Sequence, residues 1–152
     1  MIKGLRGLGD LNTDFEKEFM EELQHKNITE KIIGASFEVH KFLGNGFQEV
    51  IYQRALVYEF RKAGLEFGRE IEQDIFYKEL KEPIGTRRAD FIVEGKILVE
   101  IKAVIKLEDV HLAQALNYLK AYRLAIGLLI NFGAKSLEFK RLILTSKSAK
   151  SV

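Results

Sequence analysis

Residues 97–105 read Ile97-Leu98-Val99-Glu100-Ile101-Lys102-Ala103-Val104-Ile105, and the rest of the chain can be arranged around this segment. Side chains alternate between the two faces of a β-strand. One face of this segment is therefore wholly apolar, whereas the other places Glu100 and Lys102 between Leu98 and Val104. The segment predicts an interior strand that carries a carboxylate and an ammonium group on one face.

Charges on an interior strand need a physical explanation. Burying either ion alone costs several kcal/mol, so each needs an oppositely charged partner or a metal ion. At ~3.3 Å per residue, Glu100 and Lys102 lie roughly 7 Å apart, close enough to act on one bound group. Spacing alone leaves two interpretations open. One is a structural ion pair, Glu100 with Lys102 or Asp90 with Arg88, and the other is a functional site.

The preceding strand carries a second anomaly, because Asp90 lies between Ala89 and Phe91 and aspartate is disfavoured in strands. Asp90 meets Glu100 across an antiparallel pair if Val93 pairs with Ile97 and the loop is residues 94–96. A two-residue loop would instead put Asp90 opposite Val99. We predict the three-residue loop or a compensating bulge, with Asp90 and Glu100 on a shared face.

Two converging carboxylates beside a lysine have a direct chemical use. Hard oxygen ligands suit Mg²⁺ or Mn²⁺, which retain water molecules and bind substrate phosphates. Such an ion lowers the pKa of an attacking water, while Lys102 could hold that water or stabilise transition-state charge. The pattern therefore indicates metal-dependent phosphodiester hydrolysis as the functional interpretation.

The remaining pattern predicts an α/β fold, with one central mixed β-sheet flanked by helices. Apolar periodicity predicts helices over residues 13–25, 30–43, 47–63 and 109–122, with a helix end and cap at 27–29. Alternating or continuous apolar runs predict strands over residues 67–77, 87–93, 97–105, 124–130 and 137–144. We expect residues 1–27 to be a partly disordered extension with a short helix, 28–145 the domain, and 146–152 a polar tail.

Composition narrows the classes of protein further. The 152 residues are 47% hydrophobic and 30% charged, which suits one globular domain. Without cysteine there is no disulfide or cysteine zinc site, and no apolar run approaches the roughly 20 residues of a membrane span. The net charge of +2 is only weak evidence for an anionic partner. We expect a cytoplasmic protein without a signal peptide or a membrane segment.

Four motifs in order resemble a known family. Arg88-Ala89-Asp90 followed by Glu100-Ile101-Lys102 resembles the signature of the PD-(D/E)XK nucleases, with alanine in place of the usual proline before Asp90. Gly46-Phe47-Gln48-Glu49-Val50-Ile51-Tyr52 resembles the motif of the GxxExxY proteins within that superfamily. His111-Leu112-Ala113-Gln114 with Tyr118, and Leu128-Leu129-Ile130-Asn131-Phe132-Gly133, are also similar to that group. The resemblance implies a restriction endonuclease-like core, in the order helix, strand meander, helix and strand.

The resemblance also implies roles for individual residues. Asp90 and Glu100 match the metal ligands, the carbonyl of Ile101 a third ligand, and Lys102 the catalytic lysine. Glu49 matches a helical acidic residue that completes the metal site in part of the superfamily. Gln114 matches a polar residue beside the lysine, and the substrate-binding candidates are Arg88, His111, Tyr118 and Tyr52.

Simpler interpretations exist for several of these residues. Glu49 leans toward the apolar stripe of its helix, but it is also a first-turn glutamate that the helix dipole favours. His111 is also typical of an ordinary hydrogen-bonded surface histidine. Tyr52 and Tyr118 are more typical of packing residues with a tethered hydroxyl group.

The leading hypothesis is a Mg²⁺- or Mn²⁺-dependent endo- or exonuclease, with DNA favoured over RNA as the substrate and RNA left open. The alternative is a catalytically silent nucleic-acid-binding or regulatory module that retains the nuclease fold. A third hypothesis is a protein-interaction role, with a homodimer formed through the helix that carries Phe15, Phe19 and Leu23.

Overall fold

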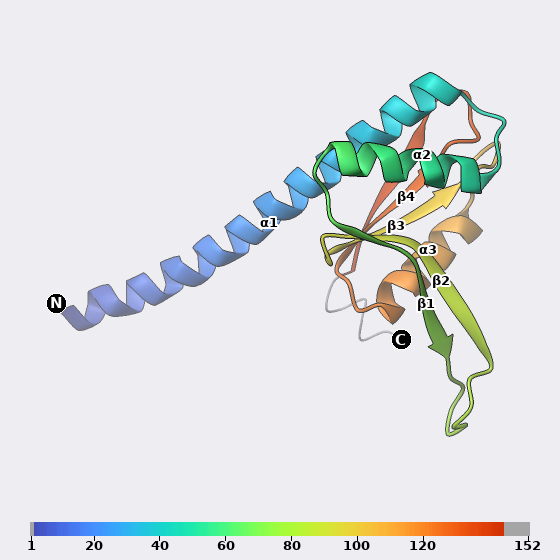
Figure 1. Cartoon of the computed structure of the whole chain (residues 1–152). Coiled ribbons are helices and arrows are strands. Elements are labelled where there is room, and N and C mark those ends of the chain that lie inside the picture. The colour runs from blue at the N-terminus through green and yellow to red at the C-terminus, as the bar shows by residue number, and fades with distance from the viewer. Residues whose placement is uncertain (1, 145–152) are drawn as a thin grey trace.

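A five-stranded sheet lies between helices in the computed structural model, which describes the backbone of residues 2–144 and side chains from residue 13 (Figure 1). The helices are α1 (Ile2–Leu43), α2 (Glu49–Lys62) and α3 (Asp109–Ala121). The strands are β1 (Phe67–Ile75), β2 (Gly85–Val93), β3 (Ile97–Lys102), β4 (Ile126–Asn131) and β5 (Glu138–Ile143). The predicted α/β fold with a mixed sheet flanked by helices is confirmed.

The strands follow one another across the sheet in chain order, β1-β2-β3-β4-β5. Neighbouring strands are antiparallel except β3 and β4, which run parallel. A parallel pair needs a crossover connection, and α3 supplies it. This crossover places α3 directly beside the end of β3, where Glu100 and Lys102 lie.

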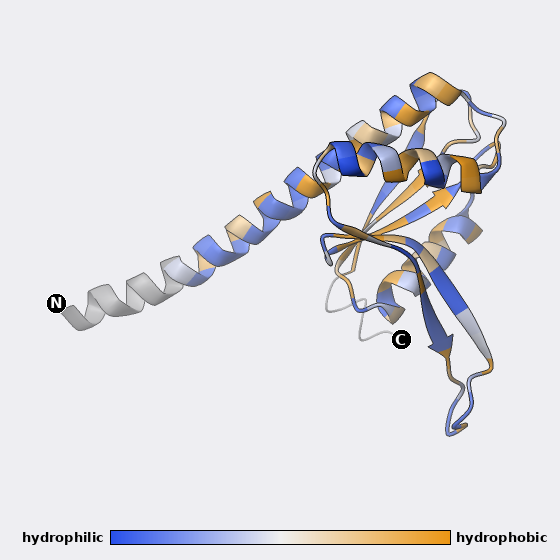
Figure 2. Ribbon diagram, in the orientation of Figure 1, coloured by the Kyte–Doolittle hydropathy of each residue, from blue (hydrophilic) through white to orange (hydrophobic). Residues whose placement is uncertain are grey.

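Two hydrophobic cores hold the three layers together. Helices α1 and α2 pack on one face of the sheet around Tyr52, Leu56 and Phe60, all fully buried. Helix α3 packs on the other face through Ala115 and Leu119. Figure 2 shows β3 and β4 mainly hydrophobic between these helices, while β1 is mainly hydrophilic where it extends beyond them. The central strands are therefore covered on both faces, as their nearly continuous apolar sequence predicts.

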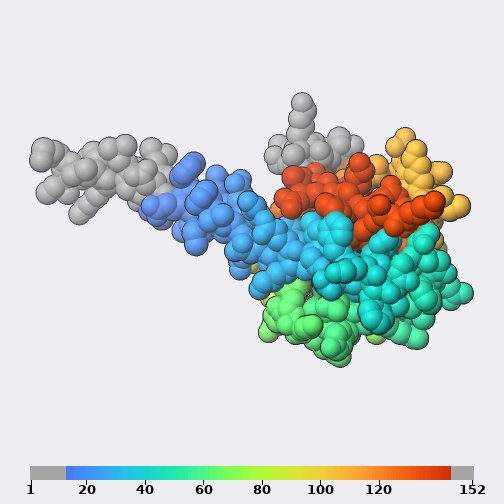
Figure 3. Space-filling view, turned by 90° about the horizontal axis from the view of Figure 1, so that it is seen from above, coloured from blue at the N-terminus to red at the C-terminus, as the bar shows by residue number. Residues whose placement is uncertain are grey.

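Helix α1 is one continuous helix, so the predicted helix end and cap at residues 27–29 are wrong. Ile28 and Thr29 are buried, and the Thr29 hydroxyl group donates within the helix to the carbonyl oxygen of Lys26 at 3.0 Å. Arg141 from β5 also donates to this hydroxyl group at 3.0 Å. Packing and these contacts override the local capping preference of the threonine. The α1 segment that follows residue 12 extends beyond the body of the molecule (Figure 3).

The β2–β3 hairpin has the predicted three-residue loop. Val93 pairs with Ile97, and the loop residues Glu94 and Gly95 have positive φ values of 54° and 63°. Glycine adopts this backbone conformation without steric cost, which helps to fix the loop length. The register that brings Asp90 toward Glu100 is thus confirmed.

No helix among residues 2–144 has the length and apolar character of a membrane span.

Candidate active site

Asp90 and Glu100 meet where the backbone pairing of β2 and β3 ends. The last paired positions are Phe91 and Val99. Beyond them, the main-chain N–H of Asp90 donates to Glu100 Oε1 at 3.3 Å, and the N–H of Ile101 donates to Asp90 Oδ2 at 2.8 Å. Carboxylate oxygens therefore replace backbone carbonyls as acceptors at this point, which holds the two acidic side chains close together.

The alternation of side chains between the two faces of the sheet is interrupted in β2 at Asp90. Phe91 belongs to the core beneath α1 and α2, whereas Ala89 belongs to the core beneath α3, although the two are an even number of residues apart. The Asp90 carboxylate consequently reaches α2, where Gln53 Nε2 donates to Oδ1 at 3.1 Å. The two carboxylates thus converge in the gap beyond the paired region, between the helical layers, rather than side by side on one flat face.

Burial raises the pKa of both carboxyl groups. Desolvation is the main cause of the rise in the pKa of Glu100 to about 8, and the nearby negative charge of Asp90 adds to it. Desolvation also raises the pKa of Asp90 to about 6, against the hydrogen bonds from Ile101 and Gln53 that lower it. Burial thus favours the protonated form of both groups, so ionising the pair costs free energy unless a cation compensates.

Neither ion pair of the structural interpretation is present. Among the described side chains, the ion pair that forms joins Arg88 to Glu72, at 3.5 Å, with both side chains more than half exposed. Lys102 makes no ion pair with Glu100 within 4.0 Å in that part of the chain, although its charge lowers the pKa of both acidic groups. The charges on β2 and β3 are thus not explained as a mutual salt bridge.

A cavity of about 320 Å³ opens beside Glu100 and Lys102. Helix α3 forms its other wall through His111, Gln114 and Tyr118. Lys102, the last residue of β3, lines this cavity. The cavity thus brings together His111, Gln114 and Tyr118 of α3 with Glu100 and Lys102 of β3.

Asn131 fixes the chain immediately after Lys102. Its side chain accepts from the N–H of Val104 and donates to the carbonyl of Val104, both at 2.9 Å. Gly133 lies so close to this segment that an added Cβ would stand 2.4 Å from Val104 main-chain atoms. This side-chain clamp is the reason that β3 ends at Lys102 rather than at the predicted residue 105.

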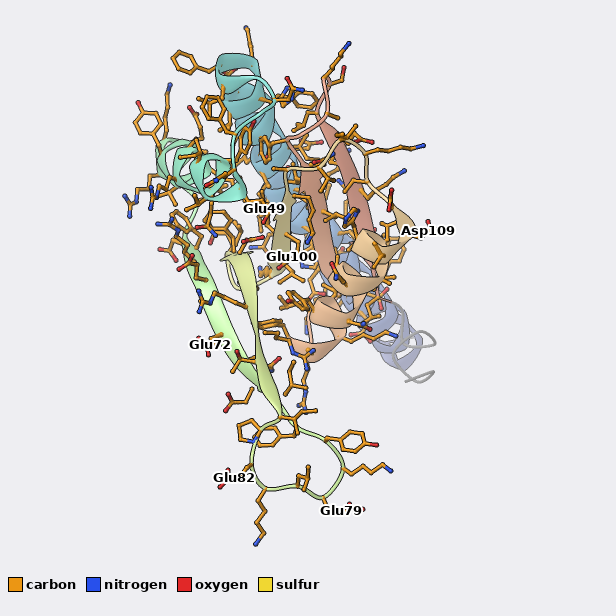
Figure 4. All side chains as sticks on the ribbon, turned by 90° about the vertical axis from the view of Figure 1, so that its right-hand side faces the viewer. Glu49, Glu72, Glu79, Glu82, Glu100 and Asp109 are labelled. Atoms are coloured by element: carbon orange, nitrogen blue, oxygen red, sulfur yellow. The ribbon has the colours of Figure 1, made fainter. Side chains whose placement is uncertain are left out.

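Glu49 is exposed as the first residue of α2 and lies toward the carboxylate pair. Its charge raises the pKa of both Asp90 and Glu100, and Figure 4 shows Glu49 and Glu100 near one another. Among residues that the structure describes, however, no three histidine, aspartate or glutamate side chains form a group that could hold a metal ion. Glu49 is therefore near the pair without joining it in a ligand cluster.

Two of the other candidates lie away from the pair. Tyr52 is fully buried, donates its hydroxyl group to the carbonyl of Gly44 at 2.6 Å, and stacks on Phe132 at 4.7 Å between ring centroids. Its hydroxyl group holds the loop before α2 in place, as predicted for a packing residue with a tethered hydroxyl group. Arg88 is exposed and engaged with Glu72.

Ile101 and His111 have ordinary structural partners as well as their places at the site. The Ile101 side chain is buried in the core beneath α1 and α2, so its carbonyl is its remaining ligand group. His111 Nδ1 accepts from the N–H of Glu108 at 2.9 Å, which caps the start of α3. This cap orients the His111 ring, which also lines the cavity.

The chain was compared with models of known protein families. A family model of the PD-(D/E)XK nuclease superfamily matches residues 26–142. The chain belongs to the PD-(D/E)XK nuclease superfamily. No curated protein and no solved structure matches the chain. The closer resemblance to the GxxExxY group stays a prediction.

The donor set of this PD-(D/E)XK nuclease domain suits a hard divalent cation. Mg²⁺ characteristically binds through one or two carboxylates, several waters and substrate phosphates, so two converging carboxylates are sufficient protein ligands. The raised pKa values of Asp90 and Glu100 show that burial disfavours their charged forms, and a bound cation would favour those charged forms. Asp90, Glu100 and the Ile101 carbonyl are thus the groups that could hold it.

Gln53 and Arg69 belong to the site but were not predicted from the sequence. Arg69 Nε donates to Gln53 Oε1 at 2.9 Å, and Gln53 donates in turn to Asp90. Gln53 is only 5% exposed, so this link between α2, β1 and β2 is shielded from water. The available signal was helical spacing, because Gln53 lies one turn after Glu49 and beside the buried Tyr52.

Proposed function

We propose that the chain is a Mg²⁺- or Mn²⁺-dependent nuclease that hydrolyses phosphodiester bonds of DNA. The observation that carries the proposal is the Asp90–Glu100 pair, in which two converging, desolvated carboxylates lack a neutralising ion pair. A structural role would favour a paired or solvated arrangement. The superfamily membership independently supports phosphodiester hydrolysis.

Each residue of the proposed site has a distinct task. Asp90, Glu100 and the Ile101 carbonyl hold the divalent cation, which neutralises charge on the scissile phosphate and acidifies a water molecule when bound. Lys102 donates hydrogen bonds from its ammonium group to a phosphate oxygen or to the attacking water. Gln114 lines the same cavity and orients the group that Lys102 contacts. Glu49 contributes charge near the cation from the start of α2.

Cleavage assays with single-stranded DNA, duplex DNA and RNA test the proposal. We expect Mg²⁺- or Mn²⁺-dependent cleavage of DNA by the wild type, and loss of that cleavage in Asp90→Ala, Glu100→Ala and Lys102→Ala. Glu79→Ala and Lys62→Ala serve as matched controls, because both residues are exposed and lie outside the site. Equal activity in all six proteins would rule the proposed site out, and cleavage of RNA alone would change the substrate.

A catalytically silent nucleic-acid-binding module is the second candidate function. The observation that favours it is the lack of a group of three acidic or histidine side chains among the described residues. Binding that weakens with salt but produces no cleavage with any divalent ion would support this candidate. We further propose that the chain belongs to the GxxExxY group, on the motif at residues 46–52. We also propose a cytoplasmic location, which suits a sequence without cysteine.

A further inference from the structure

A second hollow adjoins the active-site cavity along α3. Its volume is about 490 Å³, and it is lined by Ile75, Thr86, Arg87, Asn117, Tyr118, Lys120 and Ala121. Tyr118 lines both this hollow and the cavity of Glu100 and Lys102, so the two meet at its ring. The residues at 111, 114, 118 and 121 follow the spacing of one helical face. At 1.5 Å per residue, that face provides a wall of about 15 Å.

The second hollow is positively charged. Arg87 and Lys120 line it, and none of its lining residues is acidic. Among residues 13–144, no carboxylate lies within ion-pair distance of Arg87, and its buried Nε has no hydrogen-bond partner. The guanidinium group therefore keeps an unneutralised positive charge at the hollow, which favours an anionic ligand.

The neighbouring arginine, Arg88, differs from Arg87 in that it forms an ion pair. Arg88 pairs across the sheet with Glu72 and forms the exposed ion pair with it. Arg87 pairs across the sheet with Gln73, a neutral residue whose amide N–H donates to the carbonyl of Ala121 and whose Oε1 is buried without a hydrogen-bond partner. Among the described residues, Arg87 thus lines the hollow without an ion pair, whereas Arg88 is already neutralised by Glu72.

We propose that Arg87 and Lys120 bind a backbone phosphate of a nucleic-acid strand whose scissile phosphate lies at Asp90 and Glu100. The inference rests on the proposed nuclease site and extends it by a second contact on the same strand. Three residues separate Arg87 from Asp90 along β2, which is about 10 Å. The second contact would therefore lie within a few nucleotides of the cleaved bond on the same strand.

A charge-matched pair of double variants of the full chain tests the inference. Arg87→Gln/Lys120→Gln removes the two cations of the hollow. Arg61→Gln/Lys62→Gln removes two exposed cations at the end of α2, which covers the opposite face of the sheet. Both doubles change the net charge equally, so a difference between them reports position rather than overall charge. Arg87→Lys/Lys120→Arg retains both charges and controls for misfolding.

Binding is measured separately from cleavage. Fluorescence anisotropy with labelled 12-nucleotide single-stranded and duplex DNA in Ca²⁺ gives the dissociation constant over a range of salt concentrations, and a gel verifies that the DNA stays intact. We expect Arg87→Gln/Lys120→Gln to bind about 10-fold more weakly, with a salt slope shallower by about 0.7 to 0.9 per lost contact. We expect the α2 double variant and the charge-retaining variant to bind like the wild type.

The outcomes separate this inference from the proposed function. Equal weakening in both charge-removing doubles, or no binding by the wild type, would overturn the inference. Selective weakening with no cleavage by the wild type would support the phosphate contact and refute the nuclease proposal. Cleavage by a wild type whose binding is insensitive to Arg87→Gln/Lys120→Gln would leave the nuclease proposal standing and refute the second contact.

Discussion

Asp90 and Glu100 are linked through the backbone as well as through their charges: the N–H of Asp90 donates to Glu100 Oε1 at 3.3 Å. The residue after Glu100 returns the interaction, because the N–H of Ile101 donates to Asp90 Oδ2 at 2.8 Å. Both carboxylates are thereby held in place before any ligand arrives. Preorganised groups of this kind cost little rearrangement when charge develops in a reaction.

Lys102 gives the first prediction, which concerns the reaction rather than metal binding. We expect Lys102→Met to lower kcat by about 10²- to 10³-fold, because it removes a donor aimed at transition-state charge. The affinity for Mn²⁺, measured by calorimetry without DNA, should not fall, since Lys102 is not a ligand. Lys62→Met is the control, and a lost affinity with unchanged kcat would contradict this role.

Glu100 gives a prediction about stability and pH. Its pKa is raised from 4.5 to about 8 in the folded chain, so the folded state holds the proton more tightly than the unfolded state does. Stability from this group is fully present below about pH 4.5 and is lost as pH rises to about 8. The raised pKa of Asp90 likewise lowers stability as pH rises from 3.8 to about 6.

Urea unfolding in EDTA at several pH values between 5 and 9 measures this effect. We expect Glu100→Gln to be progressively more stable than the wild type as pH rises, by up to roughly 5 kcal/mol. Mg²⁺ should restore wild-type stability at the high-pH end, because a cation offsets the buried charge. Glu79→Gln should follow the wild type throughout. Parallel curves for Glu100→Gln and the wild type would show that Glu100 is not the titrating group.

Gln53 gives a prediction about positioning. We expect Gln53→Ala to weaken Mn²⁺ binding roughly 10- to 100-fold, because residues that orient a metal ligand commonly have effects of this size. At saturating Mn²⁺ the kcat should recover most of its wild-type value, which a simple loss of folded protein would not allow. Gln24→Ala, at an exposed position of α1, is the control. Unchanged Mn²⁺ affinity would exclude the proposed orientation of Asp90 by Gln53.

The exposed part of α1 gives a prediction about assembly. Phe15, Phe19 and Leu23 are 69%, 51% and 38% exposed and follow one another at one-turn intervals. On an ideal helix they point roughly opposite to the buried Ile28 and Ile32, so they do not face the chain's own domain. A second copy presents the same stripe, which suits a symmetric homodimer.

Sedimentation of the full chain tests this homodimer. We expect Phe15→Ser/Phe19→Ser to convert a dimer into a monomer without lowering the melting temperature of the domain. Phe42→Ser removes an even more exposed phenylalanine, 90% exposed, at the other end of α1 and should leave the dimer intact. A wild type that sediments as a monomer at all concentrations would refute the dimer.

The hairpin register shows what the sequence could predict. Strand alternation and the length of the turn between Val93 and Ile97 determined which residues face one another, so the meeting of Asp90 and Glu100 followed from local rules. The change of facing between Phe91 and Ala89 did not follow from them. It depends on how β2 packs between two helical layers, which alternation alone does not encode.

The sequence did not show which of two adjacent residues contacts the site. Motif resemblance pointed to Arg88, but the residue beside α3 is Arg87, because Arg88 faces Glu72 on β1. Tyr52 and Gln53 are likewise adjacent on α2, and only the glutamine contacts Asp90. The predicted helix boundary at residues 27–29 failed for a related reason, since burial against the sheet overrode a local capping signal.

The end of the β2–β3 pairing has a consequence for how the site could be observed. Glu100 Oε1 and Asp90 Oδ2 accept from backbone amides, and the same oxygens are among those that a divalent cation would bind. A carboxylate oxygen has two lone pairs, so a cation can share it with an amide N–H, and the cation weakens that hydrogen bond by withdrawing electron density. The amide protons of residues 90 and 101 should exchange with solvent faster when the ion is bound, so two backbone signals would report its arrival without DNA, cleavage or a spectroscopic metal.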